Sequence, residues 1–467
     1  MKMANINGLF YERKNVWERI DDDEKEAVLS FCEDYKIFLN KVKTEREAVQ
    51  FCSEFVQAKG FKDISTIEKL KPGDSVFVEK NQKALVMAVI GSRPIVEGLN
   101  LIGAHIDSPR LDLKPQTLFE KENLGLLKTH YYGGIKKYQW TSIPLSLHGV
   151  IIKSDGSKFD FIIGEKEDES VFTITDLLPH LAKEQMEKKM SEAIPGESLN
   201  ILCGSNPVTD KNIKEKVKAY ILEYLYSNYG IIEEDFISAE IEAVPAWGAR
   251  DIGFDRSLIG SYGQDDRVCA FTSMKALVDA GIPETTSLVI LADKEEIGSN
   301  GNTGMMSTLL ENSVAEIAAK LNPGDCSELL LRRVLAKSKA LSADVNAGLD
   351  PNYEDVMEKM NAAKLGYGLV ITKYTGSRGK SSSNDANAEF IAYIRNLLNK
   401  ENIIWQTGEL GKIDQGGGGT IAYLMAASGM DVVDCGVALL GMHSTFEVAA
   451  KTDIYMAYKG YKAFFNA

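Results

Sequence analysis

The chain has 467 residues, too long for one typical core and enough for about two or three domains of ordinary size. Its 44% hydrophobic and 26% charged residues are typical of a globular protein and exclude a collagen-like, low-complexity or largely disordered chain. The formal net charge of −14, with lysines and arginines scattered along the sequence, argues against a nucleic-acid binder that relies on a basic face.

The first eighty residues are expected to be helical. The acidic run of residues 21–26 opens a segment whose apolar positions recur at helical spacing, and acidic side chains favour a helix N-terminus. A second helix is expected over residues 45–59, ending at Gly60. Thr44 and Glu47 have the spacing of a capping box at the start of this helix.

Two short apolar runs, residues 84–91 and 100–106, predict strands. Beyond them the pattern changes, because residues 111–245 hold alternating apolar stretches and one charged helical tract. We therefore expect an inserted β-rich domain over residues 111–245. It would interrupt a discontinuous domain that is built from residues 1–110 and 246–467.

From about residue 246 onward, strand patterns alternate with helical patterns. Alternation of this kind predicts an α/β sheet with helices on both faces. The expected strands cover residues 287–292, 340–343, 368–372 and 432–441, and the expected helices cover residues 266–280, 387–399 and 420–428.

Four of the expected strands end in histidine or carboxylate side chains. Sites in open α/β sheets form at the carboxyl ends of the strands. Carboxylates that meet there repel one another unless a cation compensates, and a mixed histidine and carboxylate set suits zinc, manganese or cobalt. Asp265, just before an expected helix, adds a carboxylate that could bridge two metals. The residues at the strand ends are His105 with Asp107, the pair Glu295 and Glu296, Asp344, and His443.

Each of these residues also has an ordinary structural interpretation when taken alone. A Glu-Glu pair after a strand is usually a solvated turn, a strand-end histidine usually finds a local partner, and Asp265 would most often be a helix N-cap. Their convergence favours a metal site, because the chain has only five histidines and the other three fall within residues 111–245.

Several short strings follow one another along the chain and carry a family resemblance. Gly103-Ala104-His105-Ile106-Asp107-Ser108-Pro109, Asp293-Lys294-Glu295-Glu296-Ile297-Gly298-Ser299, Ser342-Ala343-Asp344 and Gly441-Met442-His443-Ser444 are the four main ones, accompanied by Tyr132-Gly133-Gly134, Asp350-Pro351-Asn352-Tyr353 and Gly376-Ser377-Arg378. In this combination the chain resembles the aspartyl aminopeptidase family of metallopeptidases, from about residue 8 to Phe465.

The resemblance implies a dinuclear metallopeptidase with an α/β/α sandwich fold, interrupted by an inserted β-rich dimerisation domain. Two divalent metal ions are implied as cofactors, zinc in the first place and cobalt or manganese as alternatives. By the same resemblance, His105 and Asp344 are terminal ligands of one metal, Glu296 and His443 are those of the other, Asp265 is the bridge, Glu295 is the general base, and Asp107 orients His105.

Two positions depart from the family pattern. Where relatives resemble Asp-Asn-Leu, this chain has Asp265-Asp266-Arg267, so Asp266 stays open as an alternative bridge. Many relatives carry arginine two residues beyond the serine of the last string, and this chain has Phe446 there. That change removes any substrate contact made by the arginine, but it leaves the histidine ligand in place.

Substrate and partners also follow from the resemblance. The implied substrates are peptides with an acidic N-terminal residue, which require a cation near the first side chain. Lys373 matches that cation. The alternative interpretation, that Lys373 is an ordinary exposed lysine at the end of a strand, has equal weight. His180 resembles a histidine that a neighbouring dimer subunit supplies to stabilise the oxyanion. Dimers of the family usually build a dodecameric shell, which would limit the substrates to peptides.

Three classes of function stay open: a metal-dependent aminopeptidase, another amide hydrolase such as a carboxypeptidase or deacylase on the same metals, and a non-catalytic shell protein. The last is disfavoured, because neither Glu295 nor any implied ligand is missing. Two nucleotide-binding patterns are rejected. A P-loop would need glycine where Tyr374 stands, and the loose dinucleotide pattern at residues 417–422 follows polar residues instead of a buried strand.

The cysteines and the N-terminus predict a cytoplasmic protein. Residues 1–17 lack the apolar region of a signal peptide, and the apolar runs are far shorter than the roughly 20 residues of a membrane span. The six cysteines are far apart and form no C-x-x-C pair, as is typical of reduced residues: Cys32, Cys52, Cys203, Cys269, Cys326 and Cys435.

Overall fold

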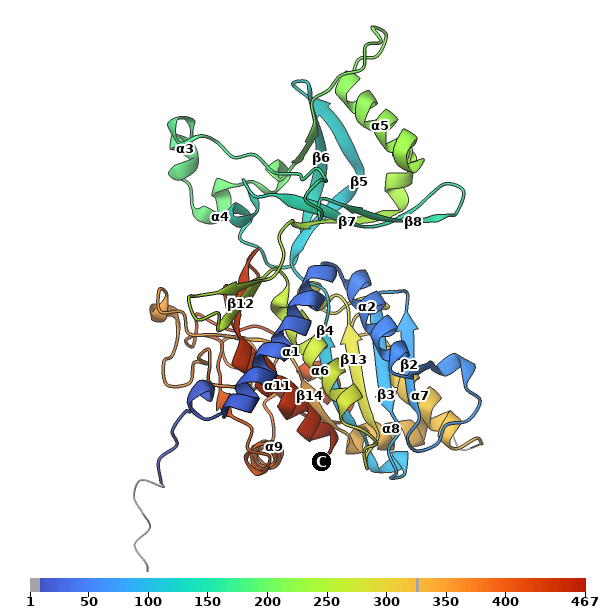
Figure 1. Ribbon diagram of the computed structural model, residues 1–467, viewed down its shortest axis with the longest axis vertical. Helices are drawn as coiled ribbons and strands as arrows, with labels where there is room; N and C mark the ends of the chain where they lie inside the picture. Colours follow the sequence, from blue (N-terminus) through green and yellow to red (C-terminus); the bar gives the residue numbers. More distant parts are fainter. Residues whose placement is uncertain (1–8, 325–326) are drawn as a thin grey trace, which may run out of the picture.

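The computed structural model describes residues 9–324 and 327–467, which form three β-sheets and the helices around them (Figure 1). Of the six cysteines, Cys326 lies outside the described residues. None of the helices within these two ranges is both long enough and apolar enough to cross a membrane.

The largest sheet has nine strands, and its centre is parallel. β4 lies between β13 and β14, and β14 pairs with β18 on its other side. The five strands expected here before residue 400 are confirmed to within two residues at each end. The spatial order is β1 (Lys62–Asp63), β2 (Ser75–Lys80), β3 (Ala84–Val89), β13 (Ser287–Ala292), β4 (Asn100–His105), β14 (Lys339–Ser342), β18 (Asp431–Gly436), β16 (Leu369–Thr372) and β17 (Trp405–Thr407).

Helices cover both faces of this sheet (Figure 1). One face carries α1 (Asp22–Lys41), α2 (Glu45–Ala58), α6 (Gln264–Asp279), α9 (Ala388–Lys400) and α11 (Lys451–Phe465), and the other carries α7 (Leu309–Leu321), α8 (Glu328–Lys337) and α10 (Ala422–Ala427). Side chains along β3 alternate between the two cores, Leu85 and Met87 in the first and Val86 and Ala88 in the second. The predicted α/β/α sandwich is therefore confirmed.

A further sheet of five strands was not predicted. Its order is β11 (Arg250–Ile252), β12 (Leu258–Ser261), β20 (Glu447–Ala450), β19 (Ala438–Leu440) and β15 (Asn346–Ala347). The single strand expected over residues 432–441 is wrong, because the chain leaves the nine-stranded sheet after Gly436 and continues as β19 in the five-stranded one. At Gly436 the backbone crosses so close to Asp344 that a Cβ would lie 1.9 Å from the Asp344 carbonyl oxygen.

Residues 111–245, the inserted segment, build most of a separate six-stranded sheet, which Figure 1 shows above the rest of the molecule. Helix α5 (Lys216–Tyr229) packs on this sheet and shares its apolar core with Trp140 and Phe161. The short helices α3 (Lys183–Met186) and α4 (Met190–Ala193) project to one side. All neighbouring strands are antiparallel, in the order β8 (Lys158–Ile163), β7 (Leu145–Ile152), β10 (Ala239–Pro245), β5 (Arg110–Lys121), β6 (Leu124–Tyr132) and β9 (Ile201–Gly204).

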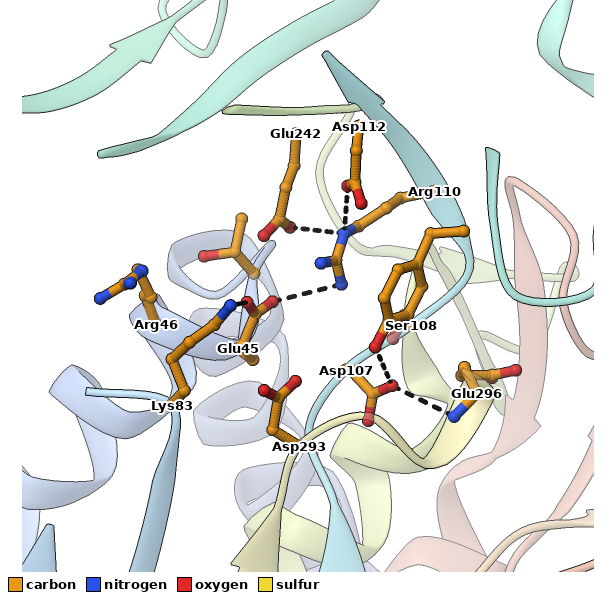
Figure 2. Close-up of polar contacts among 12 residues, drawn as sticks. Glu45, Arg46, Lys83, Asp107, Ser108, Arg110, Asp112, Glu242, Asp293 and Glu296 are labelled. Carbon is orange, nitrogen blue, oxygen red and sulfur yellow. Dashed lines mark hydrogen bonds and ion pairs between the residues drawn. The ribbon is translucent and has the colours of Figure 1, made fainter. Parts of the chain in front are cut away.

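Buried ion pairs join the inserted segment to helix α2 (Figure 2). Arg110, the first residue of β5, has its Nη1 3.2 Å from Glu45 Oε2 on α2. Its Nε lies 2.8 Å from Asp112 Oδ1 and 3.1 Å from Glu242 Oε2 on β10. Lys83 lies 2.9 Å from the other oxygen of Glu45. One guanidinium therefore links three carboxylates, two from the six-stranded sheet and one from helix α2.

A second polar contact joins α2 to the inserted segment. Glu47 confirms the predicted capping box, since its N–H donates to Thr44 Oγ1 and its Oε2 accepts from Thr44 N. Its Oε1 lies 2.7 Å from Nδ1 of His148 on β7, and Glu165 Oε1 lies 3.0 Å from Nε2 of the same ring. Burial alone would lower the pKa of His148, but the two carboxylates outweigh burial and raise the pKa to about 9.

Replacing His148 with glutamine is expected to remove a pH-dependent part of the stability. A histidine whose pKa is raised by folding stabilises the folded state fully below its ordinary pKa, and this contribution is lost as the pH rises through about 9. The advantage of the wild type over H148Q should be on the order of 3 kcal/mol near pH 6 and vanish near pH 10. Urea unfolding at both pH values measures it, with exposed His130→Gln as the control. An advantage that does not change with pH would contradict the prediction.

Candidate metal centre

Three neighbouring strands of the nine-stranded sheet end at one place, and predicted ligands follow each of them. His105 is the last residue of β4. Glu295 and Glu296 follow β13 on one side of β4, and Asp344 follows β14 on the other. All four side chains line one cavity of about 430 Å³. The ends of the parallel strands thus bring together residues that are far apart in the sequence.

The Glu295-Glu296 pair lies in the turn just after β13. Two adjacent residues can face one cavity in a turn, but not within a strand. Glu295–Ile297 form one turn of 3-10 helix, entered through Lys294 in the left-handed conformation (φ 67°). The carboxylate of Asp107 fixes this turn by accepting from the backbone N–H groups of Glu295 (3.1 Å) and Glu296 (3.2 Å). Both glutamates therefore line the same cavity, whereas neighbours within a strand point to opposite faces.

Asp265 lies between the two histidines. Its Oδ1 is 3.2 Å from Nε2 of His105, and its Oδ2 is 3.2 Å from Nε2 of His443. The same nitrogen of His443 lies 3.4 Å from Glu296 Oε1. His443 comes from the turn between β19 and β20 of the five-stranded sheet, with φ 64°, and not from the end of a strand in the large sheet as expected. Each carboxylate oxygen of Asp265 thus faces a different imidazole.

Asp266 faces the same site. Ligand atoms of His105, Asp266 and Asp344 lie within 4.8 Å of one another, and so do those of His105, Asp265 and Glu296. Both members of the pair left open by the sequence therefore reach His105. Asp265 also contacts His443, whereas Asp266 groups with Asp344.

The crowding of buried carboxylates makes the site suitable for cations. Burial raises the pKa of Glu296 well above its ordinary value, and Asp265 adds to the effect. The pKa of Asp344 is raised in the same way by burial and by Asp266. Glu296 Oε1 and Asp266 Oδ1 are buried without a hydrogen-bond partner. Carboxylate oxygens and imidazole nitrogens are ligands of zinc, manganese and cobalt, so the residues present fit a centre for divalent cations.

Glu295 has the properties of a general base. Burial raises its pKa to about 7; the carboxylates of Asp107 and Asp265 add to this effect, and His105 opposes it. A base works best when its pKa lies near the operating pH. Glu295 also lines the cavity beside the candidate ligands, where a reacting water would have to stand.

Lys373 is not brought into the lining of this cavity. The remaining lining includes uncharged residues such as Thr375, Leu410 and Met442. Lys373 is exposed, and its Nζ pairs with Asp385 Oδ1 at 2.7 Å. Lys380 pairs with the second oxygen of Asp385 at 2.9 Å. Asp385 therefore already compensates the charge that was expected to attract an acidic substrate.

His180 is also separate from the cavity within this chain. It lies exposed in a 3-10 turn, Pro179–Leu181, of the inserted segment, and it is not among the residues that line the cavity. Large exposed apolar side chains surround it in the sequence, namely Leu177, Leu178, Leu181, Met186 and Met190.

Two buried residues that hold the site were missed by the sequence reasoning. Glu447 accepts from the N–H of Asp265 (3.1 Å) through Oε2 and from the N–H of His443 (2.8 Å) through Oε1. Tyr132 donates its hydroxyl to Asp107 Oδ2 at 2.8 Å. Tyr132 appeared in the sequence only as part of a family string. No sequence signal pairs Glu447 with Asp265, which lies 182 residues earlier.

Known proteins share the sequence of this chain over most of its length. The family model described as "Aminopeptidase I zinc metalloprotease (M18)" matches residues 38–465. A probable M18 family aminopeptidase 1 of Clostridium acetobutylicum is 52% identical over 464 residues, covering 98% of this chain and 99% of the relative.

Solved structures show the same fold. The crystal structure of an M18 family aminopeptidase from Thermotoga maritima has a TM-score of 0.94 at 47% identity, covering 98% of this chain and all of that one. The dodecameric mApe1 of S. cerevisiae has a TM-score of 0.75 at 22% identity, covering 95% of this chain and 97% of that one. The predicted resemblance is confirmed at the level of the family: the chain belongs to the M18 family of zinc metallopeptidases and is a metal-dependent aminopeptidase.

Proposed function

We propose that this aminopeptidase works with two divalent metal ions, zinc in the first place and cobalt or manganese as alternatives. His105 and Asp344 would hold one ion, Glu296 and His443 the other, and Asp265 would bridge them. The observation that carries the proposal is the position of Asp265, whose two carboxylate oxygens each lie 3.2 Å from Nε2 of a different histidine. Asp266 is the alternative bridge, because it groups with His105 and Asp344.

The mechanism follows from the placement of the acids. A pair of bound divalent ions lowers the pKa of a water and polarises the scissile carbonyl. Glu295 would accept a proton from the attacking water and return it to the leaving amine, a role that suits its pKa of about 7. Asp107 would orient His105, whose Nδ1 lies 3.0 Å from the Asp107 carbonyl oxygen.

We propose peptides with an acidic first residue as the preferred substrates, with Lys373 as the cation that attracts the side chain. The 2.7 Å ion pair with Asp385 means that a substrate carboxylate would have to compete for Lys373. Removing Asp385 should then favour acidic substrates, and removing Lys373 should disfavour them. A carboxypeptidase or deacylase on the same centre is the competing activity, and it differs in that it needs no free N-terminal amine.

Residues 111–245 are proposed as a dimerisation domain inserted into a catalytic domain of residues 1–110 and 246–467. Their separate sheet and core, and the exposed apolar residues around His180, support this division. His180 would then reach the oxyanion of the neighbouring subunit, and dimers would build a dodecamer. The mApe1 of S. cerevisiae, which has the same fold, is a dodecamer. A cytoplasmic location is proposed, since the five described cysteines are free thiols.

Removal of metal is expected to abolish aminopeptidase activity, and zinc is expected to restore it. The test compares aspartyl, glutamyl and leucyl chromogenic amides before chelation, after chelation, and after adding back single metals. The same amides with a blocked N-terminus should not be cleaved, because an aminopeptidase needs the free amine. Full activity in a metal-free sample, or faster cleavage of the blocked amides, would contradict the proposed function.

Lys373→Ala tests the substrate preference within the same panel. The variant should lose kcat/KM on aspartyl and glutamyl amides and keep it on the leucyl amide, and Asp385→Asn should shift the ratio the other way. An equal loss on all three amides would assign Lys373 a structural role.

A further inference from the structure

The end of strand β6 is the place where the inserted segment touches the candidate metal centre. Tyr132, the last residue of β6, donates its hydroxyl to Asp107 Oδ2 at 2.8 Å. Two residues later, the carbonyl oxygen of Gly134 lies 3.0 Å from Nδ1 of His443. Residues 132–134 therefore contact Asp107, which lies beside His105, and His443 itself.

Asp107 concentrates several contacts on one buried carboxylate. Besides the hydroxyl of Tyr132, it accepts from the N–H groups of Glu295 and Glu296, and its Oδ1 lies 3.4 Å from Nδ1 of His105. Asp107 is fully buried, so no water replaces a lost donor without rearrangement. The Tyr132 hydroxyl thus helps to fix the carboxylate that sets the Glu295 turn and the His105 ring.

Gly134 helps to fix the ring of the second histidine, His443. A carbonyl oxygen only accepts, so Nδ1 of His443 must carry the hydrogen in this contact. In the neutral imidazole, the form that binds a metal, Nε2 then carries the lone pair, and Nε2 is the atom that faces Asp265 and Glu296. His105 shows the same arrangement, with its Nδ1 on the carbonyl of Asp107.

The segment between these two contacts is held in place from both sides. The guanidinium of Arg110 lies over the ring of Tyr132, 3.8 Å from its centroid. Gly133 has φ 71°, and a Cβ there would lie 3.2 Å from Cβ of Glu296. A side chain at this position would therefore both strain the backbone and press on Glu296.

We propose that residues 132–134, the β6 terminus, are a positioning element of the metal centre, so that the inserted segment sets the affinity for metal. This rests on the proposed function, in which His105, Glu296 and His443 bind the ions. Outer partners that orient metal-binding side chains are typically worth about 10–100-fold in metal affinity. The inserted segment then acts on the centre within a single subunit, independently of any role in self-association.

The test is the affinity for zinc, measured by competition with a chromophoric chelator on the full-length protein. Tyr132→Phe keeps the ring under Arg110 and removes only the hydroxyl, and it is expected to weaken zinc binding by about 10–100-fold. Tyr131→Phe is the matched control, because Tyr131 is the exposed neighbour on the same strand. Co²⁺ absorption spectra of the same variants should change for Y132F and stay as in the wild type for Y131F.

A second pair of variants separates site geometry from backbone strain. Gly133→Ala is expected to weaken zinc binding, whereas Gly156→Ala should not, since Gly156 has a similar φ of 83° with nothing within 4 Å of its Cβ position. Wild-type affinity in both Y132F and G133A overturns the positioning role and leaves the proposed metal site intact. A wild-type protein that binds no zinc contradicts the proposed function itself, and with it the positioning role.

Discussion

Replacing Glu295 with glutamine is expected to lower kcat by about 10²–10⁴-fold while the metal content stays unchanged. Glutamine has nearly the same shape, but it cannot take a proton from the attacking water. Glu295 is not one of the proposed ligands, and its pKa of about 7 suits a proton acceptor at neutral pH. Metal per chain and kcat on a chromogenic amide are to be measured on the same sample.

Glu296→Gln is the matched comparison for this variant. The two glutamates are adjacent and line the same cavity, but Glu296 is a proposed ligand. E296Q should therefore lose metal and activity together, whereas E295Q should lose activity alone. A metal-loaded E295Q that keeps wild-type kcat would refute the assignment of Glu295 as the base, and loss of metal in E295Q would make it a ligand.

Arg110→Met is expected to destabilise the folded protein by about 3–5 kcal/mol. Arg110 is 4% exposed, and it compensates the carboxylates of Glu45, Asp112 and Glu242. Methionine preserves much of the apolar stem of the side chain, so the substitution mainly removes the positive charge. Burial already raises the pKa of Glu242 well above its ordinary value despite the presence of Arg110, which shows how poorly that carboxylate is solvated. The free energy of unfolding in urea measures the effect.

Arg332→Met is the control for this experiment. Arg332 pairs with Glu328 one turn away on α8, and both side chains are exposed. Exposed pairs of this kind contribute little, so the unfolding midpoint of R332M should equal that of the wild type. If R110M unfolds at the wild-type midpoint, the cluster shown in Figure 2 does not hold the inserted segment in place.

The chemistry of the site was predictable from sequence because parallel strands align their carboxyl ends. β13, β4 and β14 are neighbours, so the acids and the histidine that follow these three strands had to meet. A local rule also sufficed for the capping box of Thr44, whose partner Glu47 is three residues away. The turn that carries Glu295 was expected from the adjacent acids, but the contact that fixes it comes from Asp107, 188 residues earlier.

The rest depends on contacts between distant segments. The chain leaves the nine-stranded sheet after Gly436, where it passes close to the backbone of Asp344. No apolar pattern in the sequence indicates this close passage. The position of His443 follows from that exit. Glu447 accepts from Asp265, 182 residues earlier, as well as from the nearby His443, and Tyr132 donates to Asp107, 25 residues earlier. Asp385 meets Lys373 only through the fold. Sequence patterns indicate burial and periodicity, and neither property indicates which distant residues will form a hydrogen bond or an ion pair.

The five-stranded sheet contributes His443, the nine-stranded sheet contributes His105, and the six-stranded sheet contributes the Gly134 carbonyl that holds His443. The positions of the ligands therefore depend on how the three sheets are placed relative to one another. A rotation of any one sheet by a few degrees would displace an imidazole. Substitutions buried between the sheets, far from any substrate, should therefore alter turnover, because they displace histidines that line the cavity. Laboratory evolution of this enzyme would then find many of its gains in packing positions that no substrate ever contacts.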